Sequence, residues 1–306
     1  MNVKRVLDVE IAKRKLPQTK LMVWFDGQFF TDNLTPDLID EKFANPSEST
    51  LIYQLLLFFS KDSARTFELT VPSQKNLVFL TEFIPLFESA NQLDCKITYN
   101  LATNASFTLY EQHLNKKPLN LQQKIIAAQN ARFYGYKQIT PQNSFSETIT
   151  AELMGNNAQF YLRALGMVAP HLQISCNCVV KHLAQSCQSD LLYKTLLKEQ
   201  SRTDFKAKVV VPREALETKA EVNNHNLLLD PTATAHTSPS LEVYADNVVC
   251  KHGATVGEFD PLALYYLRSR GLSEANARQL LANAFSSEIM SQFPLWLTQN
   301  RPLPEF

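Results

Sequence analysis

Short β-type segments recur through the middle of the chain, and they constrain its fold more than any other feature. Polar stretches separate these segments between about Thr148 and Val249. The segments are Phe160–Leu165, Leu172–Val180, Leu191–Leu197, Lys208–Val211 and Leu241–Val249. Many short strands at this spacing are typical of a sandwich, a barrel or a solenoid. No strict letter repeat distinguishes these architectures, so the residues alone leave all three open.

The N-terminal third has a mixed pattern. The apolar run from Leu21 to Phe30 is broken by Asp26-Gly27, which predicts a strand, a tight turn and a second strand. Thr35 followed by Pro36 predicts a helix start, and residues 47–60 predict a buried helix. We therefore expect a small mixed α/β cap here.

From Cys95 the pattern changes to strands. Lys96–Tyr99 and Ser106–Tyr110 predict two strands joined by Asn100–Asn104, because Asn adopts turn conformations readily. One helix is expected to interrupt the strands at about 119–132, where the apolar residues fall near one helical face.

The end of the chain predicts two helices. The first begins at Asp260-Pro261 and ends near Arg270, and the second begins at Ser273 and ends before Pro294. An apolar stripe on the second helix either packs on the β body or faces a partner. The stripe consists of Ala277, Leu280, Leu281, Ala284, Phe285 and Ile289. We divide the chain into an N-terminal region (1–94), a β core (95–257) and a helical segment (258–306).

Composition excludes several classes of protein. The chain has 45% hydrophobic residues and equal numbers of basic and acidic ones, 30 each, which excludes disorder throughout and disfavours nucleic-acid binding. No apolar run is long enough for a bilayer and the first twenty residues do not resemble a secretory signal, so we expect a cytoplasmic protein. Its seven glycines form no phosphate-binding loop, which argues against an ATPase or a nicotinamide enzyme.

Two cysteine-containing pairs could bind a metal. Cys250 and His252 lie at alternate positions of an extended segment, so both point to one face and could share a metal ion. They are an incomplete ligand set unless a second chain supplies the rest. Cys176 and Cys178 share a strand face in the same way, but this pair is a weaker metal prediction because buried thiols also serve as small core residues.

Paired carboxylates are an alternative source of chemistry. Some of them could form the acid/base pair found in sugar-cleaving β-solenoids, although most carboxylates are simply solvated. The candidates are Glu111, Glu152, Asp190 and Glu242. A cytoplasmic β-solenoid enzyme acting on a carbohydrate is therefore an alternative function.

Three C-terminal segments resemble the SufB/SufD family of iron-sulfur cluster assembly proteins. They are Ser240–Gly257, Tyr265–Gly271 and Ala275–Phe285. Within the first, Cys-Lys-His-Gly-Ala-Thr-Val-Gly is similar to the SufD branch, whereas the SufB branch typically has Glu-His-Glu-Ala-Thr there. The resemblance implies a mainly β fold, a right-handed parallel β-helix followed by a C-terminal helical segment. It therefore selects the solenoid.

The same resemblance implies a non-catalytic scaffold subunit. His252 and Cys250 would lie at an interface with SufB, where a nascent iron-sulfur cluster assembles with a cysteine and a glutamate of SufB. The isolated chain would hold no stable cofactor and could form a homodimer. The C-terminal helices would dock onto the ATPase SufC through Tyr266, Arg268, Arg270, Leu280 and Phe285. A third interpretation is a structural partner whose Cys-x-His is only packed.

Overall fold

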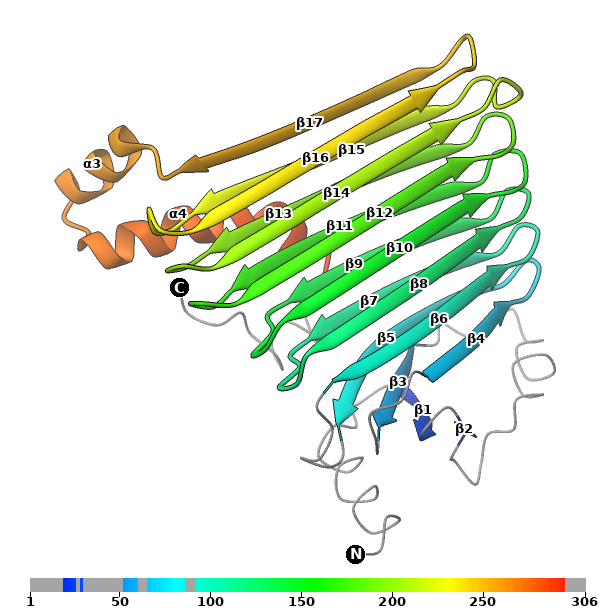
Figure 1. Ribbon diagram of the computed structural model, residues 1–306, viewed down its shortest axis with the longest axis horizontal. Helices are drawn as coiled ribbons and strands as arrows, with labels where there is room; N and C mark the ends of the chain where they lie inside the picture. The colour runs from blue at the N-terminus through cyan, green and yellow to red at the C-terminus, as the bar shows by residue number, and fades with distance from the viewer. Residues whose placement is uncertain (1–18, 26–27, 30–51, 60–64, 86–91, 295–306) are drawn as a thin grey trace, which may run out of the picture.

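The chain forms a parallel β-solenoid of about six turns, followed by two helices (Figure 1). The computed structural model describes residues 19–25, 28–29, 52–59, 65–85 and 92–294. Two sheets line the solenoid. The ten-stranded sheet consists of β1 (Thr19–Phe25), β2 (Gln28–Phe29), β3 (Ile52–Phe59), β5 (Asn76–Pro85), β7 (Ser106–His113), β9 (Arg132–Ile139), β11 (Gln159–Val168), β13 (Gln188–Leu197), β15 (Lys219–Leu228) and β17 (Val249–Glu258).

The seven-stranded sheet faces the ten-stranded one. Its strands are β4 (Arg65–Val71), β6 (Leu93–Leu101), β8 (Leu119–Ala127), β10 (Phe145–Leu153), β12 (Gln173–His182), β14 (Arg202–Val211) and β16 (Thr234–Val243). The chain alternates between the sheets, so each strand pairs in parallel with the strand two places along the sequence. The exception is the antiparallel hairpin of β1 and β2, where Trp24 pairs with Phe29 as the Asp-Gly turn predicts.

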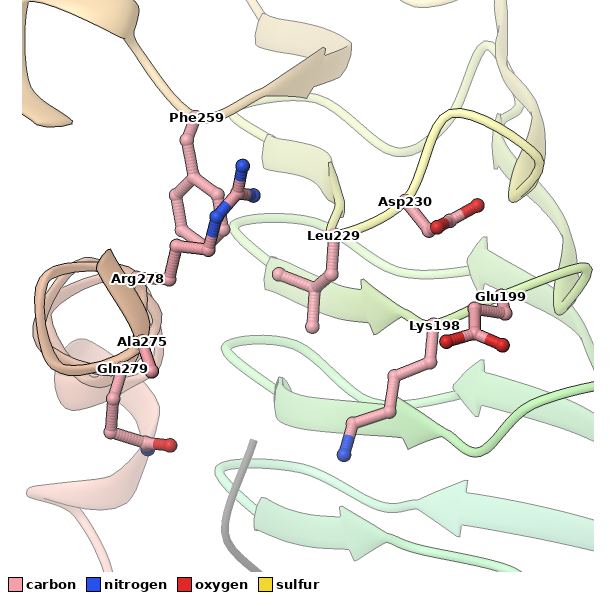
Figure 2. A pocket seen from close by; sticks show the side chains of 8 residues that line it. All are labelled: Lys198, Glu199, Leu229, Asp230, Phe259, Ala275, Arg278 and Gln279. Atoms are coloured by element: carbon pink, nitrogen blue, oxygen red, sulfur yellow. The ribbon is translucent and has the colours of Figure 1, made fainter. Parts of the chain in front are cut away.

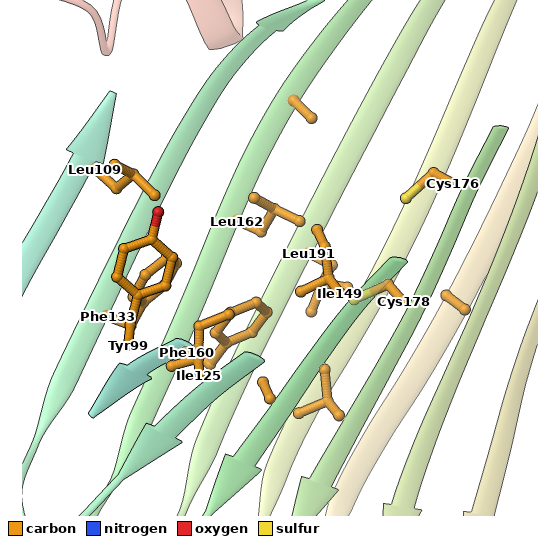
Figure 3. Close-up of a cluster of buried hydrophobic side chains, with 14 of the residues drawn as sticks. Tyr99, Leu109, Ile125, Phe133, Ile149, Phe160, Leu162, Cys176, Cys178 and Leu191 are labelled. Atoms are coloured by element: carbon orange, nitrogen blue, oxygen red, sulfur yellow. The ribbon is translucent and has the colours of Figure 1, made fainter. Parts of the chain in front are cut away.

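Alternating side chains from the two sheets fill the solenoid (Figure 3). Inward residues of successive strands stack in columns, as the period of two requires. Phe133 stacks on Phe160 with ring centroids 5.3 Å apart, and Tyr99 lies at the same distance from Phe107. Such pairs add about 0.5–1.5 kcal/mol each beyond the area they bury.

One corner of the solenoid repeats the same turn in successive coils. Each turn from the seven-stranded sheet to the ten-stranded one contains a non-glycine residue with positive φ, Asn in several cases. Asn130 donates a side-chain hydrogen bond to Asn104, 26 residues earlier, and Asn157 donates to Asn130 across 27 residues. Ser186 bonds to Glu217 across 31 residues. Because the coil length varies, no fixed letter repeat appears in the sequence.

Three expectations about secondary structure are wrong. Residues 119–132, expected to form a helix, instead form strand β8 and the start of β9. The segment 47–60 is also expected to be a helix, but its described residues form strand β3. Gln123 is a polar residue at an inward position of β8, so the alternation of apolar and polar residues that marks a strand is interrupted in the sequence. The segment Leu241–Val249 is the turn between β16 and β17 with the ends of both strands. The helix start at Thr35-Pro36 lies outside the described residues.

The two C-terminal helices begin and end as expected. Helix α3 (Pro261–Ser269) is capped by Asp260, and α4 (Glu274–Met290) by Ser273. α4 lies on the outer face of the ten-stranded sheet and buries Ala282 and Ile289 in a second apolar core, and Ala277 is buried as well. Neither helix combines the length and the apolar composition needed to cross a bilayer.

The expected stripe on α4 is only partly correct. Leu280 and Ala284 are exposed, whereas Ala282 and Ser286 are buried. Ser286 is compatible with burial because its hydroxyl donates to the backbone carbonyl of Ala282. The buried face of α4 is therefore rotated from the one that the apolar letters indicate.

His182, at the end of β12, predicts acid sensitivity. Its side chain is fully buried 2.8 Å from the hydroxyl of Ser189, and burial lowers its pKa from 6.5 to about 4. Between these values the unfolded chain binds a proton that the folded chain does not, so stability falls as pH falls. We expect a loss of about 1.5 kcal/mol between pH ~6.5 and ~5.

Denaturant titrations over this pH range check the prediction. His182→Gln should flatten the pH dependence, whereas replacing the exposed His236 by Gln should leave it in place. Equal slopes for the parent and His182→Gln would show that His182 is not the group responsible.

Candidate functional site

The last coil of the solenoid is uncovered. Strand β17 ends the ten-stranded sheet and β16 ends the seven-stranded one, and no strand in the described part of the chain pairs beyond them (Figure 1). Val249 and Val256 of β17 are exposed, whereas alternate residues of the preceding strand β15 are buried. An open parallel edge with exposed apolar residues is a template for pairing with another chain.

Cys250 and His252 lie on the inner side of this last coil. Cys250 is in register with Ala220, and His252 with Val222, both of which are buried inward residues of β15. The two side chains therefore share a face, as their spacing predicts. Cys250 is half-buried against the core, and burial raises the pKa of its thiol. His252 is exposed, with Nδ1 3.2 Å from the carbonyl oxygen of Pro239 on β16.

This arrangement suits an incomplete metal site. A proton on Nδ1 of His252, donated to Pro239, leaves the Nε2 lone pair for a metal ion. Sulfur and imidazole donors are suitable ligands for iron-sulfur clusters. The missing ligands would have to come from whatever covers the open coil.

Cys176 and Cys178 lie in a different environment. Both are buried inward residues of β12 within the main core (Figure 3), and burial raises the pKa of both thiols, that of Cys178 to about 12. This environment disfavours the thiolate form that binds metals. A metal at these cysteines stays a prediction.

A buried ion cluster occupies the interior nearby, and sequence reasoning did not predict it. The Lys137 ammonium lies between Glu111, at 2.9 Å, and Glu147. Gln123 contacts both Lys137 and Glu111, and His113 Nε2 lies 3.5 Å from Glu111. Glu111, His113 and Glu147 are the one group of at least three possible metal ligands among the described residues. The ammonium already lies between the carboxylates, so the group is a salt bridge.

The charges in this cluster stabilise one another. Burial alone would raise the pKa of Glu111, but Lys137 and His113 lower it to about 2. Burial likewise opposes the charge of Lys137, yet Glu111 and Glu147 raise its pKa. Glu111 and Lys137 are therefore both charged at neutral pH.

The four carboxylates considered for carbohydrate chemistry do not pair with one another. Glu111 points inward, and the other three lie on the outer faces of the strands. Each contacts a basic residue, namely Lys137 for Glu111, Lys124 and Lys181 for Glu152, Arg163 for Asp190, and Lys208 for Glu242. A pair of carboxylates acting as acid and base is therefore not formed by these residues.

A cleft lies between α4 and the loops that follow β13 and β15, and Figure 2 shows its lining. Its volume is about 330 Å³. Arg278 of α4 lies 5.5 Å from the ring of Phe259 and pairs with Glu274 at 3.1 Å. Lys198 and Asp230 line the opposite side. Neither Cys250 nor His252 contributes to the cleft.

The predicted docking residues lie on and around the two helices. Tyr266 is exposed, with Arg270 5.3 Å from its ring, and Arg268 is 3.5 Å from Glu274. Leu280 is exposed on α4, whereas Phe285 is half-buried against the sheet. α3 buries none of its own residues, and Leu262 and Tyr265 add to its exposed apolar surface.

Comparison with known proteins agrees with this fold. Residues 70–285 match the family described as SUF system FeS cluster assembly, SufBD core domain. This solenoid therefore belongs to the SufBD core-domain family of the SUF system for iron-sulfur cluster assembly. Within the family it is SufD-like: it is 28% identical over 216 residues to the iron-sulfur cluster assembly protein SufD of Escherichia coli, covering 69% of this chain and 50% of that protein.

Two further relatives match over shorter regions. A SufBD family protein of Synechocystis is 44% identical over 110 residues, which is 36% of this chain and 24% of that protein. SufD of Plasmodium falciparum is 29% identical over 110 residues, 36% of this chain and 8% of that protein. The matches thus span half or less of each of these relatives.

Proposed function

We propose that this chain is a SufD-like, non-catalytic scaffold subunit that assembles iron-sulfur clusters in the cytoplasm at an interface with a SufB-like protein. The observation that carries the proposal is the position of Cys250 and His252 on the inner side of the uncovered last coil. Family membership supplies the context. In this proposal residues 95–257 form the β core and residues 258–306 the docking segment.

The partner would cover the open coil. Strands β16 and β17 would pair with the solenoid of the SufB-like protein, which supplies a thiolate and a carboxylate to complete the ligand set. The nascent cluster is cargo that the isolated chain does not hold. Without that partner, the same edge could pair with a second copy of the chain.

The C-terminal helices would contact a SufC-like ATPase. Exposed Tyr266 and Leu280 offer apolar area, and Arg268 and Arg270 offer guanidinium groups for carboxylates of the ATPase. Phe285, which packs on the sheet side of α4, would contribute the part of its ring that remains exposed. ATP-driven movement of the ATPase would reach the interface as a conformational change.

His252→Ala tests the role of the interface pair. The tagged chain is co-expressed with SufB-like and SufC-like proteins, and iron and acid-labile sulfide are measured in the eluate. We expect an intact complex with a reduction in bound iron and sulfide of about tenfold or more, because even the outer-shell partners of metal ligands commonly contribute about 10–100-fold to metal affinity. The matched control is Lys251→Ala, a neighbouring exposed residue on the outer side of the same strand.

Equal iron and sulfide with and without the His252 side chain would contradict the proposal and favour a packed Cys-x-His. Loss of the complex itself in His252→Ala would contradict the proposal that His252 binds the cluster without being needed to hold the subunits together.

A further inference from the structure

Lys194 attaches α4 to the solenoid by three different contacts. It lies on the outer face of β13, buried beneath the helix. Its Nζ donates to the backbone carbonyl of Phe285 at 3.0 Å and to Glu288 at 2.6 Å, and it lies 5.0 Å from the centre of the Phe285 ring. One ammonium therefore contacts backbone, carboxylate and aromatic ring on the same turn of the helix.

Lysine is an unusual residue at this position. Its neighbours along the same face of β13, Leu192 and Leu196, belong to the apolar core beneath α4. A leucine here would add apolar area without the desolvation that a buried ammonium requires. Unlike leucine, lysine makes directional hydrogen bonds. They form only when the helical turn that carries Phe285 and Glu288 lies directly over Lys194, so they fix the position of α4.

Residues in register with Lys194 continue across the sheet to its open edge. Lys194 is in register with His225 of β15, and His225 with Thr255 of β17. His225 Nδ1 lies 2.9 Å from the Thr255 hydroxyl. Burial lowers the pKa of His225, the Lys194 charge lowers it further, and Glu288 opposes them. Arg163 is a further charge acting on Glu288.

We propose that Lys194 is a positioning residue that fixes α4 on the sheet and, through His225 and Thr255, ties the position of α4 to the strand that carries Cys250 and His252. Thr255 follows His252 by three residues on β17. Displacing α4 therefore alters the order of the edge strand. This proposal rests on the proposed function only for its biological use, since the coupling is a property of the chain alone.

The test uses the isolated full chain and the near-isosteric change Lys194→Met. Amide hydrogen exchange is followed in α4 and β17, and the pKa of His225 is followed by NMR. We expect exchange to be about tenfold faster in both elements. The pKa of His225 should rise, because the variant removes a cation and keeps the Glu288 carboxylate. Glu288→Gln should lower it, and Lys194→Arg should restore slow exchange in both elements.

A control separates positioning from packing. Leu196→Ala loosens the same apolar core, so it should speed exchange in α4 without the rise in the His225 pKa. Thr255→Val should speed exchange in β17 while α4 stays protected. Faster exchange in α4 alone in Lys194→Met, with β17 and the pKa of His225 unchanged, would overturn the proposal. Unchanged exchange in α4 would overturn it as well. Since no partner or cluster is present, these results do not depend on whether the chain assembles clusters.

Discussion

Replacing Lys137 by methionine is expected to destabilise the folded chain by about 3–5 kcal/mol, because it leaves Glu111 and Glu147 buried without their shared cation. Methionine is close to lysine in volume, so the effect isolates charge from packing. Denaturant titration at neutral pH measures the change. The matched control is Lys124→Met, which removes a partly exposed partner of Glu152 and should cost no more than about 1 kcal/mol.

The stability difference between the parent and Lys137→Met should depend on pH. The folded-state pKa of Glu111 is lowered from 4.5 to about 2, so the stability due to this shift is present above 4.5 and is lost as pH falls toward 2. The difference between parent and Lys137→Met should therefore shrink over this range. Replacing Glu111 and Glu147 by Gln in the Lys137→Met background should recover much of the loss. A loss that persists in this triple variant would point to packing rather than charge.

Replacing Gly155 by alanine is expected to cost about 3 kcal/mol, at the upper end for overpacking. A Cβ at this position would lie 2.1 Å from the backbone nitrogen of Gln129 and 2.6 Å from the carbonyl carbon of Ala128. These atoms belong to the turn of the preceding coil, so the clash can be relieved only by separating two stacked turns. Thermal or denaturant unfolding of the isolated chain measures the effect.

Gly257 supplies the control for this substitution. It lies on the open edge strand β17, and a Cβ there would meet nothing within 4 Å. Gly257→Ala should therefore change the stability by no more than about 0.5 kcal/mol. Similar effects at the two glycines would contradict the close stacking of the coils.

Sequence patterns predicted the elements that depend on local chemistry. The cap residues Asp260 and Ser273 lie next to the helices they define, and the Asn100–Asn104 turn contains Asn104 with positive φ. Patterns failed where distant residues decide the structure. Gln123 is inward because Lys137 and Glu111 provide partners inside the solenoid, and these come from other strands.

The candidate site was predictable only in part. A period of two places Cys250 and His252 on one face whatever surrounds the strand. That this face belongs to an uncovered coil depends on the absence of another strand beyond β17 in the described residues, which no local pattern contains. The buried ion cluster and the contacts of Lys194 were missed because coil lengths of 26 to 31 residues hide which residues become neighbours.

The repeated corner turns have a thermodynamic consequence. In every such turn except the one with Asn247, the positive-φ residue donates its backbone N–H to a carbonyl of the next coil, as Asn130 does to Asn156. Each coil thus accepts a backbone hydrogen bond from the coil before it, so the stability of the solenoid depends on interactions between neighbouring coils. The coil with Asn247 has no successor among the described residues, so unfolding should begin there, beside Cys250. A protein bound at this end would act as one more coil, and its affinity would be measurable as added resistance to unfolding.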